Sequence, residues 1–463
     1  MIEKLNSVKF VCTTADIWST KKRSFFGYTC HWLDNNFQRH SVALACSRMA
    51  GSHTFHRVAE FVQRINDDFH LSNEQIVCTI TDNGSNFVKA FKEFGISLDN
   101  EGQSEGVADY DDDVPESQEI PLFRLPKHYR CGCHTLNLLA TTDYMSIIKS
   151  DSRVFGEHAS VLKRCSAIWN KCNRPKTAEC IKSLLGCSLK TPVATRWNTL
   201  YDAFKHVLKF KDQFDDLFKL LDVTKFTSSE MEYLQEYCKI MEPLATGLDF
   251  LQNEKTMLYG YFVPTILTLK VKWEKMNLNN EFNFLNVRIV DLINALEGRF
   301  RDIFTVSPKV HDAFVAAITC PAIKFKFLPS MKSTAQEWTD LKFKDMFLKH
   351  ASAFFNDTPS TSVRSKGLSF FDFGETTEDL TLHESSVVVE FGRYLNDMDE
   401  DLECLNRYPI IKATFFKYNT PLPSSAPVER LFSYAGMVNG KKRQNLSDGH
   451  FEKLVVLKAN NVF

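Results

Sequence analysis

Strand-like runs follow one another at the start of the chain, and their order constrains the fold more than any other feature. Three runs rich in β-branched and aromatic residues are joined by short polar turns, and a segment with helical spacing follows them. A fourth strand-like run comes after that segment. This order predicts an antiparallel meander extended into a mixed α/β sheet, with helices on one face. The predicted strands are residues 8–18, 26–34, 39–49 and 76–81, and the predicted helix is residues 54–69.

The fourth run, IVCTIT, stops at Asp82, and a helix-like pattern, FVKAF, follows a few residues later. Asp82 therefore falls at the carboxyl end of a buried strand, where open α/β sheets collect functional side chains. Asp16 lies near the end of the first strand, so the two carboxylates converge if these strands are neighbours. Hard cations such as Mg²⁺ prefer oxygen ligands, and two-metal phosphoryl chemistry uses such carboxylates. Alternatively, an aspartate at a strand end caps a turn or a helix.

A third acidic candidate, Glu429, lies in SSAPVERLFS near the end of the chain. Ser424 or Ser425 can cap a helix here, and Pro427 suits its first turn. The helix dipole alone favours a glutamate in a first turn, so Glu429 taken by itself indicates either a ligand or an ordinary helix start.

Two other motifs have both a functional and a structural interpretation. RCGCH brings together Cys131, Cys133 and His134, but a closed zinc site needs a second ligand group at suitable spacing, so no structural zinc is expected. TRWNTLYDAF places Arg196 beside Trp197, a pair that can contact phosphate and stack on an unstacked base. On an amphipathic helix, the same two residues more often serve packing and surface.

Charge is unevenly distributed in a chain whose formal net charge is −1. Residues 96–120 contain nine acidic residues and no Lys or Arg, which predicts a polar loop. Residues 121–220 contain seventeen Lys plus Arg against eight Asp plus Glu, a surplus of nine. This basic middle either neutralises phosphates or forms the solvated surface of helices.

Changes in hydropathy pattern divide the chain into four predicted parts. Helical spacing dominates the middle, and a stretch rich in Ser, Thr and Gly precedes the C-terminal region. The parts are a sheet-containing core (1–135), a helical insertion (136–356), a linker (357–387) and a C-terminal region (388–463).

Composition predicts a globular protein inside the cell. Hydrophobic residues make up 44% and charged residues 24% of the chain, an ordinary globular balance. No apolar run is long enough to span a bilayer, and the first residues do not form a signal sequence, so no membrane partner is expected. The thirteen Cys are therefore expected to be reduced thiols.

Five short motifs, taken in order, resemble the hAT superfamily of transposases, and most closely the BED-type zinc-finger proteins derived from them. They are TTADIWS, TDNGSNFVKAF, CGCHTLNL, TRWNTL and SSAPVERLFS. The resemblance runs from about residue 8 to the end of the chain. It implies an RNase H-like core interrupted by a large helical insertion, with a C-terminal dimerisation region that completes the core.

The resemblance also implies roles for particular residues. Asp16, Asp82 and Glu429 match the family's acidic triad, which holds Mg²⁺ or Mn²⁺ for DNA hydrolysis and strand transfer. The implied partners are DNA and a second copy of the chain, and the implied location is the nucleus.

Two further motifs carry roles by the same resemblance. Arg196 and Trp197 match a pair that contacts DNA, in which the tryptophan stacks on a flipped base. Cys131 and His134 match a CxxH motif that supports the active site, which also argues against zinc there.

The sequence departs from the family in three places. Members usually carry an N-terminal BED zinc finger, which is absent here, so recognition of a DNA site has no support in this sequence. Val428 precedes the glutamate where many active elements have Ser, and Cys404 and Leu405 stand where relatives often have an aromatic pair. Two hypotheses follow: a catalytic transposase, or a domesticated protein that regulates transcription through DNA or protein binding and dimerisation without cutting.

Overall fold

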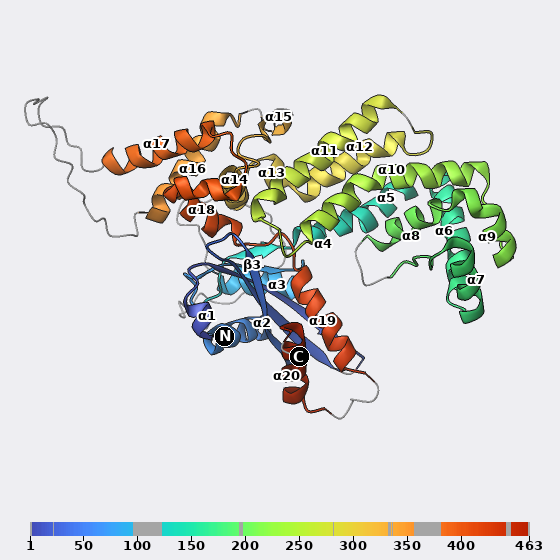
Figure 1. The fold of residues 1–463 in the computed structure, drawn as a ribbon, viewed down its shortest axis with the longest axis horizontal. Helices are drawn as coiled ribbons and strands as arrows, with labels where there is room; N and C mark the ends of the chain where they lie inside the picture. Colours follow the sequence, from blue (N-terminus) through green and yellow to red (C-terminus); the bar gives the residue numbers. More distant parts are fainter. Residues whose placement is uncertain are drawn as a thin grey trace, which may run out of the picture.

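The structure is a computed structural model, and it consists of a sheet with helices on both faces and a long helical part above it (Figure 1). It describes residues 2–21, 23–95, 123–193, 198–280, 282–331, 335, 337–355, 381–440 and 446–461. The acidic run at 96–120 and most of the predicted linker lie outside these residues.

Five strands form one mixed sheet in the order β3-β2-β1-β4-β5. The first three are antiparallel neighbours, as the predicted meander requires, and β4 and β5 run parallel to β1. The fifth strand was not predicted, because its three residues stand directly before a helical pattern. The strands are β1 (Val11–Ser19), β2 (Ser24–Leu33), β3 (Arg39–Met49), β4 (Ile76–Thr81) and β5 (His128–Arg130).

Helices cover both faces of this sheet, whereas the sequence predicted cover on one face only. The apolar residues of α2 (Phe55–Asp68) and α3 (Ser85–Phe94) share one core with β1 and β2. Those of α19 (Ala426–Val438) and α20 (Asp448–Ala459) form a second core with β2 and β3. The local pattern of the first strands did not show this second cover because its helices come from the far end of the chain, although the family resemblance implied a C-terminal region that completes the core.

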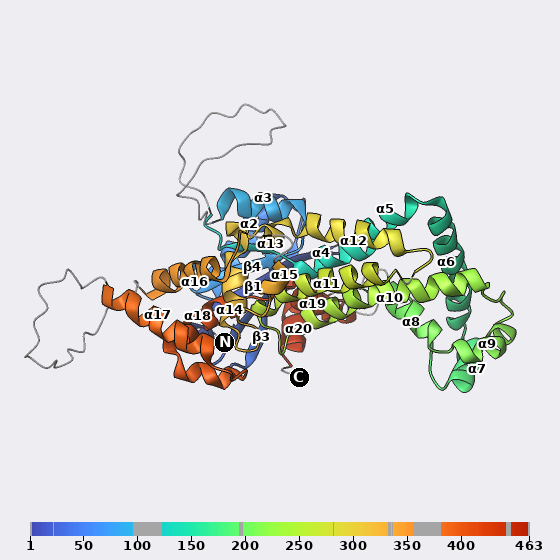
Figure 2. The ribbon, with the colours of Figure 1, turned by 90° about the horizontal axis from the view of Figure 1, so that it is seen from above.

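The remaining helices form an elongated part that extends beyond the sheet in two directions (Figures 1 and 2). One arm contains α5 to α10, and the other contains α14 to α18 (Figure 2). These helices are α4 (Gly132–Leu138), α5 (Tyr144–Lys149), α6 (Ser152–Cys172), α7 (Pro175–Leu185), α8 (Thr199–Leu208), α9 (Phe214–Leu221), α10 (Ser228–Leu251), α11 (Phe262–Asn279), α12 (Asn286–Arg299), α13 (Arg301–Phe304), α14 (His311–Thr319), α15 (Leu328–Met331), α16 (Asp340–Phe355), α17 (Thr381–Asn396) and α18 (Pro409–Asn419).

The C-terminal region predicted as one unit divides between these two parts. Helix α17 begins at Thr381, inside the predicted linker, and packs with α16 and α18. Helix α18 also contacts α14, so both helices extend the insertion. Helices α19 and α20 pack on a face of the sheet, whereas α18 reaches the sheet at the turn between β2 and β3, where Phe416 stacks on Phe37. In the described part of the chain, no helix is long and apolar enough to cross a membrane.

Candidate active site

Asp16 and Asp82 lie on neighbouring parallel strands, at the same edge of the sheet. Ala15 of β1 pairs with Thr81 of β4, so the two aspartates occupy the next positions along each strand. Both are partly buried. Each also accepts a backbone N–H: Asp16 Oδ1 from Ile17 at 2.7 Å, and Asp82 Oδ1 from Gly84 at 2.9 Å. Asp82 thus caps the turn into α3, and its charge still acts on Asp16 across the strands.

Helix α19 brings Glu429 toward these aspartates from the far end of the chain. Val428 and Phe432 of this helix lie over Gly27, which is the residue of β2 that pairs with Asp16. A Cβ atom at Gly27 would be 2.6 Å from Phe432 Cζ and 2.7 Å from Val428 Cγ2. The glycine therefore allows the first turn of α19 to approach the strand that carries Asp16.

The electrostatics of the three acids show that they share one environment. Burial, followed by the charges of Asp82 and Glu429, raises the pKa of Asp16 to about 8, although the Ile17 N–H opposes this. Burial and then the charge of Asp82 raise the pKa of Glu429 to about 7, against the opposing charge of Arg430. Both raised pKa values arise first from burial and second from the charge of Asp82, and a bound divalent cation would oppose both effects.

The donor set fits Mg²⁺ or Mn²⁺ in a particular way. Among the described residues, no three His, Cys, Asp or Glu side chains are grouped closely enough to hold one ion between them. Mg²⁺, however, is usually held by one or two carboxylates and completes its shell with water and substrate phosphates. Pairs drawn from Asp16, Asp82 and Glu429 would therefore supply such ligands, with water and a substrate phosphate completing the shell.

We expect Asp16→Asn to stabilise the metal-free protein at alkaline pH. Because the folded-state pKa of about 8 lies above the unfolded value of 3.8, the folded protein binds more protons between these values. The free energy of unfolding of the wild type should therefore fall as the pH rises from about 4 to about 8. The substitution should remove much of that fall.

Urea unfolding at pH 5 and pH 8 in a chelator measures this effect. Asp68→Asn, at an exposed position of α2, is the matched control. An Asp16→Asn variant that loses as much stability as the wild type between the two pH values would contradict the raised pKa.

Cys131 joins three elements of the site through its backbone and its thiol. Its N–H donates to the carbonyl of Thr81 at the end of β4, at 2.8 Å. Its Sγ accepts the N–H of His134 at 3.2 Å and the N–H of Ser425, which precedes α19, at 3.3 Å. The thiol is fully buried, and burial raises its pKa. Cys131 thus links the strand end that carries Asp82 to the helix that carries Glu429.

Replacing Cys131 with Ala should cost about 1–3 kcal/mol of stability, because two backbone N–H groups lose their acceptor. Cys131→Ser retains an acceptor and should lose less. Cys165→Ala, which deletes an equally buried core thiol, corrects for the lost volume. Chemical denaturation of the three variants measures the free energy of unfolding of each. Equal losses for Cys131→Ala and Cys165→Ala would show that the hydrogen bonds to the Cys131 thiol contribute nothing to stability.

The other predicted residues of these motifs are placed differently. Cys133 is fully buried in the core, and His134 is partly buried and contributes its backbone N–H to the Cys131 thiol. Arg196 and Trp197 lie outside the described residues. Thr199, which follows them, donates a hydrogen bond from Oγ1 to the carbonyl of Val193, which precedes them, at 3.0 Å. Their role in DNA contact stays a prediction.

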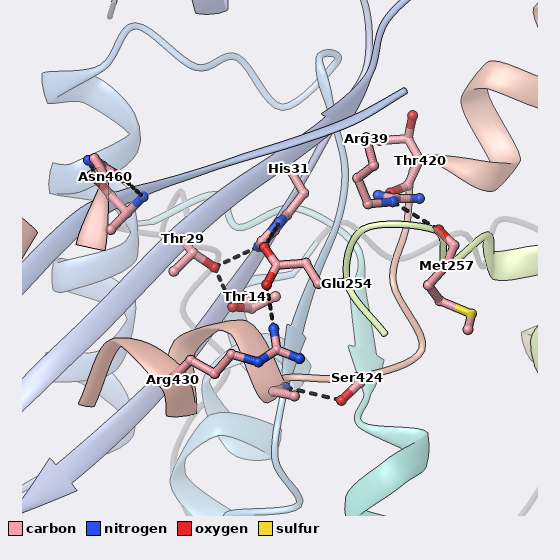
Figure 3. Close-up of polar contacts among 12 residues, drawn as sticks. Thr14, Thr29, His31, Arg39, Glu254, Met257, Thr420, Ser424, Arg430 and Asn460 are labelled. Atoms are coloured by element: carbon pink, nitrogen blue, oxygen red, sulfur yellow. Dashed lines mark hydrogen bonds and ion pairs between the residues drawn. The ribbon is translucent and has the colours of Figure 1, made fainter. Parts of the chain in front are cut away.

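Sequence reasoning missed a polar cluster beside the site, shown in Figure 3. Thr14 and Thr29 hydroxyls lie 2.6 Å apart, and Thr29 Oγ1 lies 2.7 Å from His31 Nε2. The other ring nitrogen, Nδ1, lies 3.4 Å from Glu254 Oε1, and Glu254 also forms an ion pair with Arg430 (Figure 3). The one sequence feature that could have pointed to this cluster was Arg430, a charged residue directly after the candidate acid Glu429.

Comparison with known proteins gives results in agreement with this geometry. Residues 14–107 match the model of the ZBED1 RNase-like domain. Two maize (Zea mays) proteins, "Putative AC transposase" and "Putative AC9 transposase", are each 24% identical to the chain over 202 residues. The matched part is 43% of this chain, and it spans only 22% of the length of each maize protein. The chain therefore contains a hAT-derived RNase-like domain of the ZBED1 type and is distantly homologous to the Ac transposases.

Proposed function

We propose that the chain is a DDE-type protein that cleaves DNA and transfers strands in a metal-dependent reaction. The observation that carries this proposal is that the charge of Asp82 raises the pKa of both Asp16 and Glu429, although the three acids come from two strand ends and a distant helix. A protein gains no stability from burying like charges together, and perturbed carboxylates of this kind are typical of functional sites.

In this proposal, Asp16, Asp82 and Glu429 hold Mg²⁺ or Mn²⁺. Such ions, when bound, polarise a phosphoryl oxygen and make bound water a stronger nucleophile. The Asp82 carboxylate stays fixed by the Gly84 N–H, and the Asp16 carboxylate by the Ile17 N–H, so both present defined oxygens to the ion. Arg196 and Trp197 are the proposed contacts to phosphate and to an unstacked base.

We further propose DNA and a second copy of the chain as partners, and the nucleus as the location. The surplus of nine basic residues within 121–220 supports binding to a polyanion. Val388 and Val389 on α17 are 50% and 51% exposed, which supports self-association through the C-terminal region.

Incubation of the purified chain with branched and hairpin-forming DNA ends in Mn²⁺ tests the catalytic proposal. Cleavage that requires Mn²⁺ or Mg²⁺ and stops in a chelator is the expected result. The absence of cleavage by a folded protein that still binds DNA would overturn the proposal.

A non-catalytic role in transcriptional regulation is the second candidate. One observation favours it, namely that no three metal-ligating side chains of the described residues are gathered around one point. Binding of DNA without cleavage or metal uptake would establish this second candidate in place of the first.

A further inference from the structure

The loop between α10 and α11, residues 252–258, is a junction between the helical insertion and the sheet. Arg39, at the start of β3, donates from Nε to the carbonyl of Met257 at 2.9 Å. Its other nitrogens donate to the carbonyls of Thr420 and Asn419, each at 2.7 Å. Arg39 thereby joins the loop, the sheet and the segment that leads from α18 to α19 (Figure 3).

Glu254 is the charged residue at the centre of this junction. Its side chain is 19% exposed and lies between the fully buried His31 of β2 and Arg430 of α19 (Figure 3). Burial raises the pKa of Glu254, but the neighbouring His31, Ser41 and Arg430 lower it to about 2. The Glu254 carboxylate is therefore ionised at neutral pH. Burial also lowers the pKa of His31, so the positive charge beside Glu254 at neutral pH is that of Arg430.

Arg430 contacts the loop twice and is the neighbour of Glu429 in the first turns of α19. Besides the ion pair with Glu254, its Nη2 donates to the carbonyl of Gln252 at 2.5 Å. The Ser425 side chain makes no capping hydrogen bond to this helix. Instead, Ser424 Oγ accepts the N–H of Ala426 at 3.1 Å (Figure 3). The start of α19 is thus held by Ser424, by the Cys131 thiol, by Arg430 and by apolar packing.

We infer that Glu254, a residue of the insertion, is a positioning residue for the candidate active site. It holds Arg430 against the loop. Because Arg430 and Glu429 are neighbours on α19, this contact fixes the orientation of the Glu429 side chain. This inference rests on the proposed function for its catalytic consequence, while the orientation of α19 can be measured without catalysis.

The first test uses Glu254→Gln, which keeps the shape of the side chain and removes its charge. Glu242→Gln is the matched control, because Glu242 pairs with Lys205 at an exposed site on α10 where both side chains are more than half exposed. Hydrogen exchange of the α19 amides, measured without metal or DNA, should become faster only in Glu254→Gln. Unchanged exchange in that variant, or an equal change in the control, would overturn the inference.

A double-mutant cycle separates positioning from general structural damage. If Glu254 acts through Arg430, the double variant Glu254→Gln/Arg430→Gln should change α19 exchange no more than the larger of the two single variants. Additive effects would overturn the inference.

If Glu254 positions Glu429, Glu254→Gln should lower the rate of DNA cleavage and leave the affinity for DNA unchanged. Displacement of a reacting group by about 1 Å can cost about 10²-fold, so a single-turnover cleavage rate lower by up to this factor is expected for Glu254→Gln. Glu254→Asp, which keeps the charge, should recover part of the rate, and a loss that appears in DNA binding alone would overturn the positioning role. If the wild type does not cleave DNA, the proposed function is refuted. If α19 amide exchange is nevertheless faster in Glu254→Gln, the role of Glu254 in positioning α19 is still supported.

Discussion

Asp82→Asn is expected to lower the rate of metal-dependent DNA cleavage by about 10³-fold, the loss that corresponds to several kcal/mol of metal-derived stabilisation. The charge of Asp82 raises the pKa of both Asp16 and Glu429, so Asp82 is the acid that acts electrostatically on both of the others. An Asn at this position supplies only one neutral oxygen to an ion. That oxygen can still accept the Gly84 N–H, so the turn into α3 should survive.

Single-turnover cleavage in Mn²⁺, together with a denaturation curve for each protein, measures this effect. Glu429→Gln should give a loss of similar size, and Asp68→Asn, on the exposed surface of α2, should cleave like the wild type. A folded Asp82→Asn variant that cleaves within tenfold of the wild-type rate would exclude a catalytic role for this carboxylate.

Much of the sheet, and the positions of Asp16 and Asp82 near the ends of two strands, could be predicted because the relevant signals are local. Runs rich in β-branched and aromatic residues identified the first three strands, and the abrupt end of the fourth run at Thr81 placed Asp82 at a strand end. The convergence of Asp16 and Asp82 needs only that β1 and β4 be parallel neighbours. That pairing does not follow from either strand alone, so the sequence could state it only as a condition.

The features that the sequence could not predict depend on contacts between distant segments. Strand β5 contains three residues and is defined by its pairing with β4 rather than by a pattern of its own. Glu254 belongs to no motif, and its importance arises from His31 and Arg430, which approach it from other parts of the chain. Glu429 could be proposed as a third acid, but its approach to Asp16 depends on the absence of a side chain at Gly27.

Gly27→Val should destabilise the packing of α19 on the sheet. The requirement for glycine at this position is one of space, because Phe432 and Val428 of α19 occupy the volume that a side chain would need. Inserting extra carbon atoms into a packed core costs about 1–3 kcal/mol. Valine otherwise suits a strand better than glycine does, so a net destabilisation would measure the crowding itself.

The displacement of α19 by Gly27→Val should also reach the active site, since Glu429 lies between the two residues that the new side chain meets. Trp18 stacks on Phe432, with ring centroids 6.0 Å apart, so movement of the helix should change tryptophan fluorescence. Gly436→Ala is the control on the same helix, because a Cβ there has no heavy atom within 4 Å, and it should stabilise the protein by about 0.5–1 kcal/mol. Gly27→Val could instead unfold at the same denaturant concentration as the wild type and cleave equally well. In that case α19 would not need its close contact with β2, and Cys131 and Arg430 would have to fix the position of Glu429.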